Sequence, residues 1–119
     1  MLYALLCCFS EEEWRAIDRS QRQRVMQAHA EALDVARGKN ALVTSLRLSA
    51  TETSTTVRGT GRGITVVDGP FAETREQLGG LHVIDCADLD EALAYARTYI
   101  AAGGTVEIRP LHPDPGSIE

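Results

Sequence analysis

The sequence lacks several features that would assign it to a particular class of protein. Aromatic residues make up only 5% of its 119 residues, so aliphatic side chains and alanine must supply most of a packed core. No apolar run approaches the roughly 20 residues of a membrane-spanning helix. The apolar opening Met1–Phe9 is short and has no basic start, so it does not read as a signal peptide. We therefore expect a cytoplasmic protein with no membrane partner.

Cysteine is scarce and forms no paired motif. There are three cysteines, and none stands in a Cys-x-x-Cys pair. Cys7 and Cys8 would point to opposite faces of a strand, so they cannot bind one metal ion together. The expected state is three reduced thiols in the cytoplasm. A nucleophilic Cys8 or Cys86 is the alternative, although neither has an adjacent base in the sequence.

Basic charge is also in short supply. Asp and Glu number 17 against 12 Lys and Arg, for a formal net charge of −5. Nucleic-acid binding needs a basic face, so we expect no nucleic-acid partner. The length suits one domain, which buries about two thirds of the surface of its unfolded chain. The 44% hydrophobic and 24% charged content is typical of a globular protein.

The order of apolar runs and capping motifs predicts an α+β fold. Strands are expected at residues 3–9, 41–48, 81–86 and 105–109. Ser-Glu-Glu-Glu at residue 10 and Asp-Leu-Asp-Glu at residue 88 are capping boxes that open helices. Residues 18–20 are expected to restart or kink the first of these helices, whose longer part runs to about Arg37. The Thr-rich stretch before Val57 is expected to form a strand, and Gly59–Gly63 a hairpin turn into residues 64–67. A phosphate loop is the weaker alternative there, because no helix follows. After Pro70 a short helix over residues 71–77 is expected, ended by Gly79 and Gly80.

Two helices carry apolar stripes. On the longer one the stripe is formed by Val25, His29, Leu33 and Ala36; on the helix after residue 88 we expect Leu89, Leu93, Ala96 and Ile100 to be buried. The order β-α-β, hairpin, β-α-β is the ferredoxin-like plan, with one antiparallel sheet and both long helices on one face. Since residues 3–9 are apolar on both sides, the other face also needs cover. A second copy of the sheet would supply it, giving a homodimer.

Several segments carry a family resemblance. Residues 68–80 read DGPFAETREQLGG, residues 84–92 read IDCADLDEA, residues 106–110 read VEIRP, and residues 26–29 read MQAH. Over residues 3–110 the chain resembles the DGPF family of YCII-related proteins, in the dimeric α/β-barrel superfamily. The resemblance implies a single domain over residues 1–110 with a C-terminal tail at 111–119, a homodimer, and a bacterial cytoplasmic protein.

The resemblance brings no known reaction. The family is largely uncharacterised, its genes often accompany extracytoplasmic-function sigma factors, and related proteins have a proposed His/Asp site. One relative removes chloride from a hydroxylated aromatic compound. Arg75 stands where the family usually has lysine. Arginine stays charged and cannot act as an amine nucleophile or proton carrier, but it can still pair with an anion.

His29 and Asp68 are the candidate catalytic residues. An imidazole titrates near neutral pH, and a carboxylate on its other nitrogen would fix the tautomer. A satisfied core histidine and a turn-forming aspartate are the alternatives. Glu73 and Arg75 are candidate substrate-binding residues for a polar or anionic group. Phe71 is expected to plug the space under the hairpin, with a substrate contact as the alternative.

The remaining histidines are not expected to join this pair. His82 should point opposite to Leu81 and Val83, and His112 lies in the tail. We expect no metal site and no cofactor. Two functions stay open. One is a metal-free acid–base enzyme, lyase-like or isomerase-like, acting on a small polar substrate. The other is a non-catalytic dimeric module that senses a small-molecule ligand or binds a sigma factor or another protein.

Overall fold

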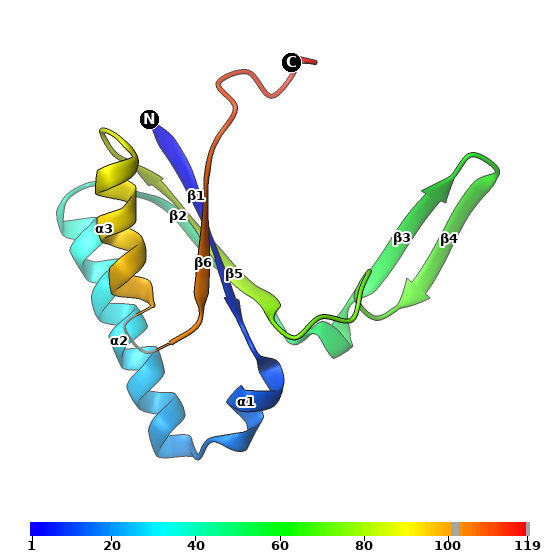
Figure 1. Ribbon diagram of the computed structural model, residues 1–119, viewed down its shortest axis with the longest axis horizontal. Helices are drawn as coiled ribbons and strands as arrows, with labels where there is room; N and C mark the ends of the chain where they lie inside the picture. Colours follow the sequence, from blue (N-terminus) through cyan, green and yellow to red (C-terminus); the bar gives the residue numbers. More distant parts are fainter. Residues whose placement is uncertain (101–102, 119) are drawn as a thin grey trace.

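The main sheet confirms the predicted ferredoxin-like plan. The computed structural model describes residues 1–100 and 103–118. Four antiparallel strands lie in the order β2-β5-β1-β6 (Figure 1). Their bounds are Leu2–Phe9 for β1, Leu42–Arg47 for β2, Gln77–Asp85 for β5 and Thr105–Pro110 for β6. Apart from the hairpin, the strands and helices follow one another along the chain in the expected β-α-β, β-α-β order.

The helices begin where the capping motifs predict. Their bounds are Glu11–Ala16 for α1, Arg19–Gly38 for α2 and Leu89–Tyr99 for α3. The Ser10 hydroxyl accepts the Glu13 amide of α1 at 3.1 Å, and Asp18 and Gln21 form a reciprocal capping box at the start of α2. Asp88 caps α3 in the same way as Ser10 caps α1. None of the helices within residues 1–100 and 103–118 is both long and apolar enough to cross a bilayer.

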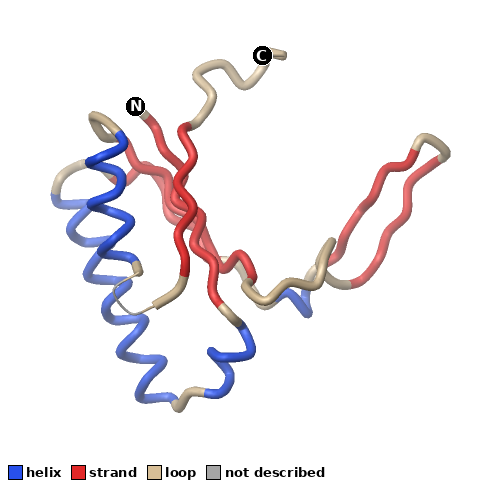
Figure 2. The backbone as a smooth tube through the Cα atoms, viewed as in Figure 1, coloured by secondary structure: helices blue, strands red, loops and turns tan. Residues whose placement is uncertain are grey.

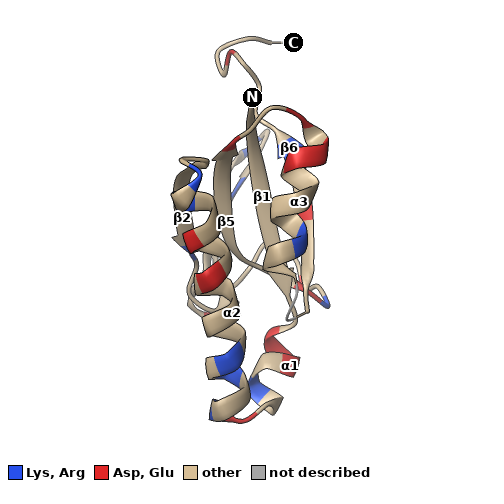
Figure 3. Cartoon of the chain, turned by 90° about the vertical axis from the view of Figure 1, so that its left-hand side faces the viewer, with Lys and Arg blue, Asp and Glu red and all other residues tan. Residues whose placement is uncertain are grey.

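The core lies between the sheet and the pair α2 and α3, which cover one face (Figure 3). Alanines on the helices allow close approach to the strands, and aliphatic and tyrosine side chains fill the space between. The buried members are Tyr3, Leu5, Ala32, Ala36, Ala41, Ile84, Cys86, Ala92, Tyr95, Ala96 and Tyr99. Leu5 and Ile84 are completely buried at the centre of the sheet.

The predicted buried stripe of α3 is wrong in part. Leu89 and Ile100 are exposed, whereas Tyr95 and Tyr99 are buried beside Ala96. The structure therefore turns the helix so that its tyrosines face the sheet. Each tyrosine ring buries more apolar area than a leucine, and ring stacking adds to that gain.

The two strands β3 (Thr55–Thr60) and β4 (Gly63–Asp68) form the predicted hairpin. They follow a short 3-10 turn, η1 (Thr51–Thr53), and project away from the main sheet (Figure 2). In the ladder Val57 lies opposite Val66, and almost every residue of both strands is exposed. An isolated two-stranded ribbon is only marginally stable in water, so the hairpin lacks the support that the main sheet has.

The short helix expected over residues 71–77 is absent. Residues 71–76 form bends and irregular chain, and β5 begins at Gln77 and continues through Gly79 and Gly80. These glycines do not break the strand. They allow close packing, because the Phe9 ring lies where a side chain on Gly79 would stand, and a Cβ on Gly80 would lie 2.6 Å from the Leu46 carbonyl oxygen.

One register across three strands gives the sheet two different faces. Ser45, His82 and Leu5 lie opposite one another on the side that α2 and α3 cover. The next position along each strand points to the other side, where Leu46, Leu81 and Leu6 form an apolar row without helical cover. We call this row and its surroundings the open face. Leu46 is 52% exposed there.

We expect Gly80→Ala to destabilise the fold by about 1–3 kcal/mol, because the added methyl meets strand backbone that cannot move aside. Gly59→Ala in β3 is the matched control, since nothing lies within 4 Å of its Cβ position. It should change stability by less than about 0.5 kcal/mol. Urea unfolding followed by circular dichroism measures both. Equal midpoints for the two variants would contradict the packing role given to Gly80.

Candidate functional site

Three polar side chains from three elements form a hydrogen-bonded chain under the helices. Nε2 of His29 lies 3.1 Å from Nε2 of His82. The other ring nitrogen of His82, Nδ1, lies 2.9 Å from the Ser45 hydroxyl oxygen. The chain therefore runs from α2 through the central strand β5 to the edge strand β2.

The expectation that His82 does not join His29 is wrong. His82 does point opposite to Leu81 and Val83, as predicted, because successive strand residues alternate between faces. However, the leucine and valine face the open side, and it is His82 that lies beneath α2 with 2% of its surface exposed. The alternation was visible in the sequence, but which face the helices cover was not.

Tyr99 completes the cluster from α3. Its ring stacks on the His82 imidazole, with centroids 4.4 Å apart and planes inclined by 18°. It also contacts the His29 ring at 5.3 Å between centroids. The Tyr99 hydroxyl is buried, and no hydrogen-bond partner for it is found among the described residues. Burial raises the pKa of Tyr99 to about 12, so the phenol stays protonated.

Both histidines are neutral near pH 7. Burial, with a smaller effect of neighbouring His29, lowers the pKa of His82 from 6.5 to about 4. Burial also lowers the pKa of His29, with a smaller contribution from the positive charge of Arg47. A neutral imidazole carries one N–H and one lone pair, so one Nε2 donates to the other.

This bonding has a consequence for the second nitrogen of His29. If Ser45 donates to His82, then His82 donates to His29, whose proton is left on Nδ1. If Ser45 accepts, every proton moves to the opposite end of its ring, and Nδ1 of His29 is left with a free lone pair. No partner for this Nδ1 is found within the described part of the chain, and His29 is only partly buried. The chain can thus present His29 as a proton donor or acceptor.

The other predicted site residues lie on or after the hairpin. Asp68 ends β4 opposite Thr55, and Glu73 and Arg75 are exposed in the segment before β5. Among the described interactions, none joins any of these three to His29. The prediction that Phe71 plugs the hairpin is wrong, because the residue is 77% exposed and only its carbonyl is bonded, by Arg58 at 3.2 Å. Nearly every residue of the hairpin is itself exposed, so the hairpin offers no core for this side chain.

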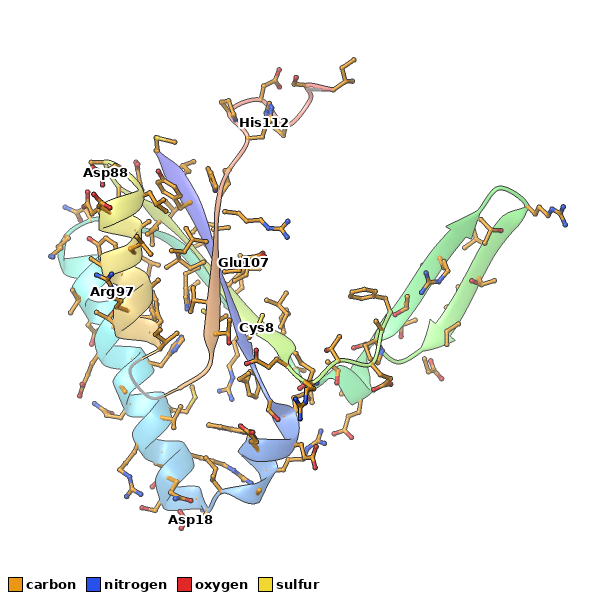
Figure 4. The ribbon with its side chains drawn as sticks, in the orientation of Figure 1. Cys8, Asp18, Asp88, Arg97, Glu107 and His112 are labelled. Carbon is orange, nitrogen blue, oxygen red and sulfur yellow. The ribbon has the colours of Figure 1, made fainter. Side chains whose placement is uncertain are left out.

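The remaining polar residues form no competing centre. His112 lies in the tail beyond β6, as predicted, and accepts the Asp114 amide (Figure 4). Across residues 1–100 and 103–118, no three His, Cys, Asp or Glu side chains are grouped to hold a metal ion. Burial raises the pKa of the thiols of Cys8 and Cys86, and that of Cys7 to about 11. The thiols are therefore protonated and weak nucleophiles at pH 7.

A cavity of about 390 Å³ opens beside α1. It lies where α1 meets the end of β1, the end of β2 and the start of β5 (Figure 1). Its walls combine aromatic, aliphatic and charged side chains. The lining residues are Phe9, Glu11, Trp14, Arg15, Arg47, Leu48, Ser49, Ala50, Leu78 and Gly79. Sequence reasoning missed this cavity, because its residues come from three stretches of the chain that lie far apart in the sequence.

Two comparisons with known proteins place the chain. A family model described as the YCII-related domain matches residues 1–113. An uncharacterised protein of Rhizobium meliloti (strain 1021) is 42% identical over 116 residues, which cover 93% of this chain and 92% of that protein. Both similarities include the hairpin as well as the main sheet, so the resemblance seen in the sequence is confirmed. Neither names a reaction or a ligand.

We expect stability to fall as the pH drops from 6.5 to 4. The unfolded chain protonates His82 near pH 6.5, whereas the folded chain does so only near pH 4, so acid favours unfolding in this window. The full effect corresponds to about 3 kcal/mol. Urea unfolding at several pH values measures it. His82→Leu should flatten this dependence and His112→Gln should keep it; a His82→Leu variant with the wild-type slope would contradict the assignment.

Proposed function

The chain belongs to the YCII-related family, and we propose that it is a small acid–base enzyme in which His29 moves a proton on a small polar substrate. The reaction class is lyase-like or isomerase-like and needs no group beyond the protein's own side chains. A reducing compartment such as the bacterial cytoplasm suits the three free thiols.

The observation that supports this proposal best is the hydrogen-bonded chain from Ser45 through His82 to His29. A general acid or base works best when its ring orientation is fixed, because the proton must leave from or arrive at a defined atom. His82 holds Nε2 of His29 from within the core, and Tyr99 packs against both rings. Nδ1 of His29 is then the atom that exchanges a proton with the substrate.

Asp68 enters the proposal through a second copy of the chain. The hairpin extends away from its own α2 (Figure 1), so Asp68 is not a partner of His29 within one subunit. Asp68 lies at the base of the hairpin, opposite Thr55, so the carboxylate offered to His29 would be that of the partner subunit's Asp68. An Asp68 carboxylate arriving in this way would stabilise His29 when it carries a positive charge.

The open face of the sheet supports the homodimer. Leu6, Leu46 and Leu81 lie side by side across three strands, and Val43 and Leu48 on β2 and just after it are also exposed. Exposed apolar area of this kind is rarely left in water by a folded protein. A second sheet with the same pattern covers it by two-fold symmetry.

The alternative is a non-catalytic module that uses the same open face to bind another protein, such as a sigma factor. The apolar row supports an interaction surface but does not say which protein binds there. In this alternative the histidine chain serves only to hold α2 on the sheet. The two functions differ in what His29 does. In the module it contributes stability and no chemistry.

We expect proton transfer to depend on His29. The protein is incubated in D2O with a mixture of small hydroxy, keto and phenolic acids, and proton NMR follows loss of C–H signals and appearance of products. His29→Gln should lower the rate of any turnover by about 100-fold or more. Asp34→Asn, an exposed change on the same helix, is the control and should leave it unchanged. Two results would favour the non-catalytic module. One is turnover that persists in His29→Gln, and the other is a wild type that turns over no compound of the mixture.

We expect a dimer at micromolar concentration in light scattering. Leu81→Glu places a charge on the open face and should give a monomer that keeps its helical content. Leu89→Glu, on the exposed side of α3, is the matched control and should stay dimeric. A stable wild-type monomer would remove the dimer and, with it, the role given to Asp68.

A further inference from the structure

The cavity beside α1 has a wall of aromatic and aliphatic side chains. Phe9 and Trp14 meet edge to face, with ring centroids 6.1 Å apart and planes at 77°. Gly79 leaves room for the Phe9 ring, since a side chain there would collide with it. Leu48 and Leu78 add aliphatic wall. Stacking and edge contacts of this kind favour a planar ring over a flexible chain.

The charged residues of the cavity are not equivalent. The Glu11 carboxylate is 8% exposed and is fully engaged, accepting the Thr51 amide at 3.1 Å and the Thr51 hydroxyl at 2.6 Å. Arg15 lies 3.7 Å from Glu11 and 3.6 Å from Glu52, so its charge is shared between two acids. Glu11 therefore fixes the loop after β2 and does not take part in ligand binding.

Arg47 is the charged lining residue whose charge no neighbouring carboxylate balances among the described residues. It ends β2 at the rim of the cavity, and among the described residues no carboxylate pairs with its guanidinium. An arginine of this kind beside an apolar wall offers two parallel N–H donors to a carboxylate. The cavity thus joins an aromatic wall to one uncompensated cation.

We propose that this cavity binds a small aromatic carboxylate, with the ring against Phe9 and Trp14 and the carboxylate on Arg47. The inference does not depend on the proposed function, because His29 does not line the cavity; only the charge of Arg47 links the cavity to the histidine chain. A bound anion neutralises Arg47. That removes one cause of the lowered pKa of His29 and makes His29 a stronger base when ligand is present.

Trp14 is the single tryptophan of the chain, so its fluorescence reports on this cavity alone. Benzoate is the probe. It should change the Trp14 emission in a saturable way with a Kd of about 1 mM or below, as expected for a ligand of this size. Benzamide, the neutral analogue of the same shape, should bind at least about tenfold more weakly. Equal binding of benzoate and benzamide, or no saturable change with benzoate, would overturn the proposal.

Variants locate the two halves of the site. Arg47→Met should weaken benzoate binding by about tenfold or more and leave benzamide unaffected. Arg62→Met, in the turn of the hairpin, is the matched loss of charge and should bind benzoate as the wild type does. Gly79→Ala should weaken both probes, because the Phe9 ring must move. Wild-type affinity in Arg47→Met would overturn the assignment of the carboxylate.

Different results would contradict the proposed binding site and the proposed reaction. His29→Gln should keep benzoate binding within about twofold, since the imidazole does not line the cavity. Binding without any His29-dependent turnover would keep the site and remove the enzyme. Turnover that does not respond to Arg47→Met would keep the enzyme and remove the electrostatic link between the cavity and His29.

Discussion

The alternation of side chains along three neighbouring strands is the constraint on which the rest of the structure depends. Because Ser45, His82 and Leu5 share one register, all three point under the helices, and their neighbours Leu46 and Leu81 must point the other way. The same geometry thus creates the histidine chain and the apolar open face. A shift of one residue in this register would exchange the two.

Burial of the histidine chain costs free energy, and the hydrogen bonds of its rings offset that cost. A polar ring taken out of water must keep its hydrogen bonds, and His82 does so at both nitrogens. Stacking of Tyr99 on that ring adds apolar contact on one side. The energetic result is a pair of neutral imidazoles, only one of which has an unbonded nitrogen. The same burial lowers the pKa of both rings.

Arg47 connects the cavity beside α1 with the histidine chain. It lines the cavity beside α1 and contributes to the lowered pKa of His29, so charge in one place is felt in the other. The hairpin stands apart from both (Figure 1), with Val57, Ile64 and Val66 exposed on one of its faces. A ribbon of this kind gains stability only when something packs on it.

Local patterns in the sequence determined the order of the sheet strands and long helices along the chain, the hairpin and the placement of His29 on an apolar stripe, because caps, turns and periodicity act over a few residues. The helix expected over residues 71–77 did not form. Local patterns did not determine which face of β5 lies under α2, how α3 is turned, or that Gly79 and Gly80 lie within a strand. Those depend on contacts between distant segments. Tertiary packing therefore brought His82 to His29. It also brought Phe9, Trp14 and Arg47 to one cavity, and no short stretch of the chain encodes such packing by itself.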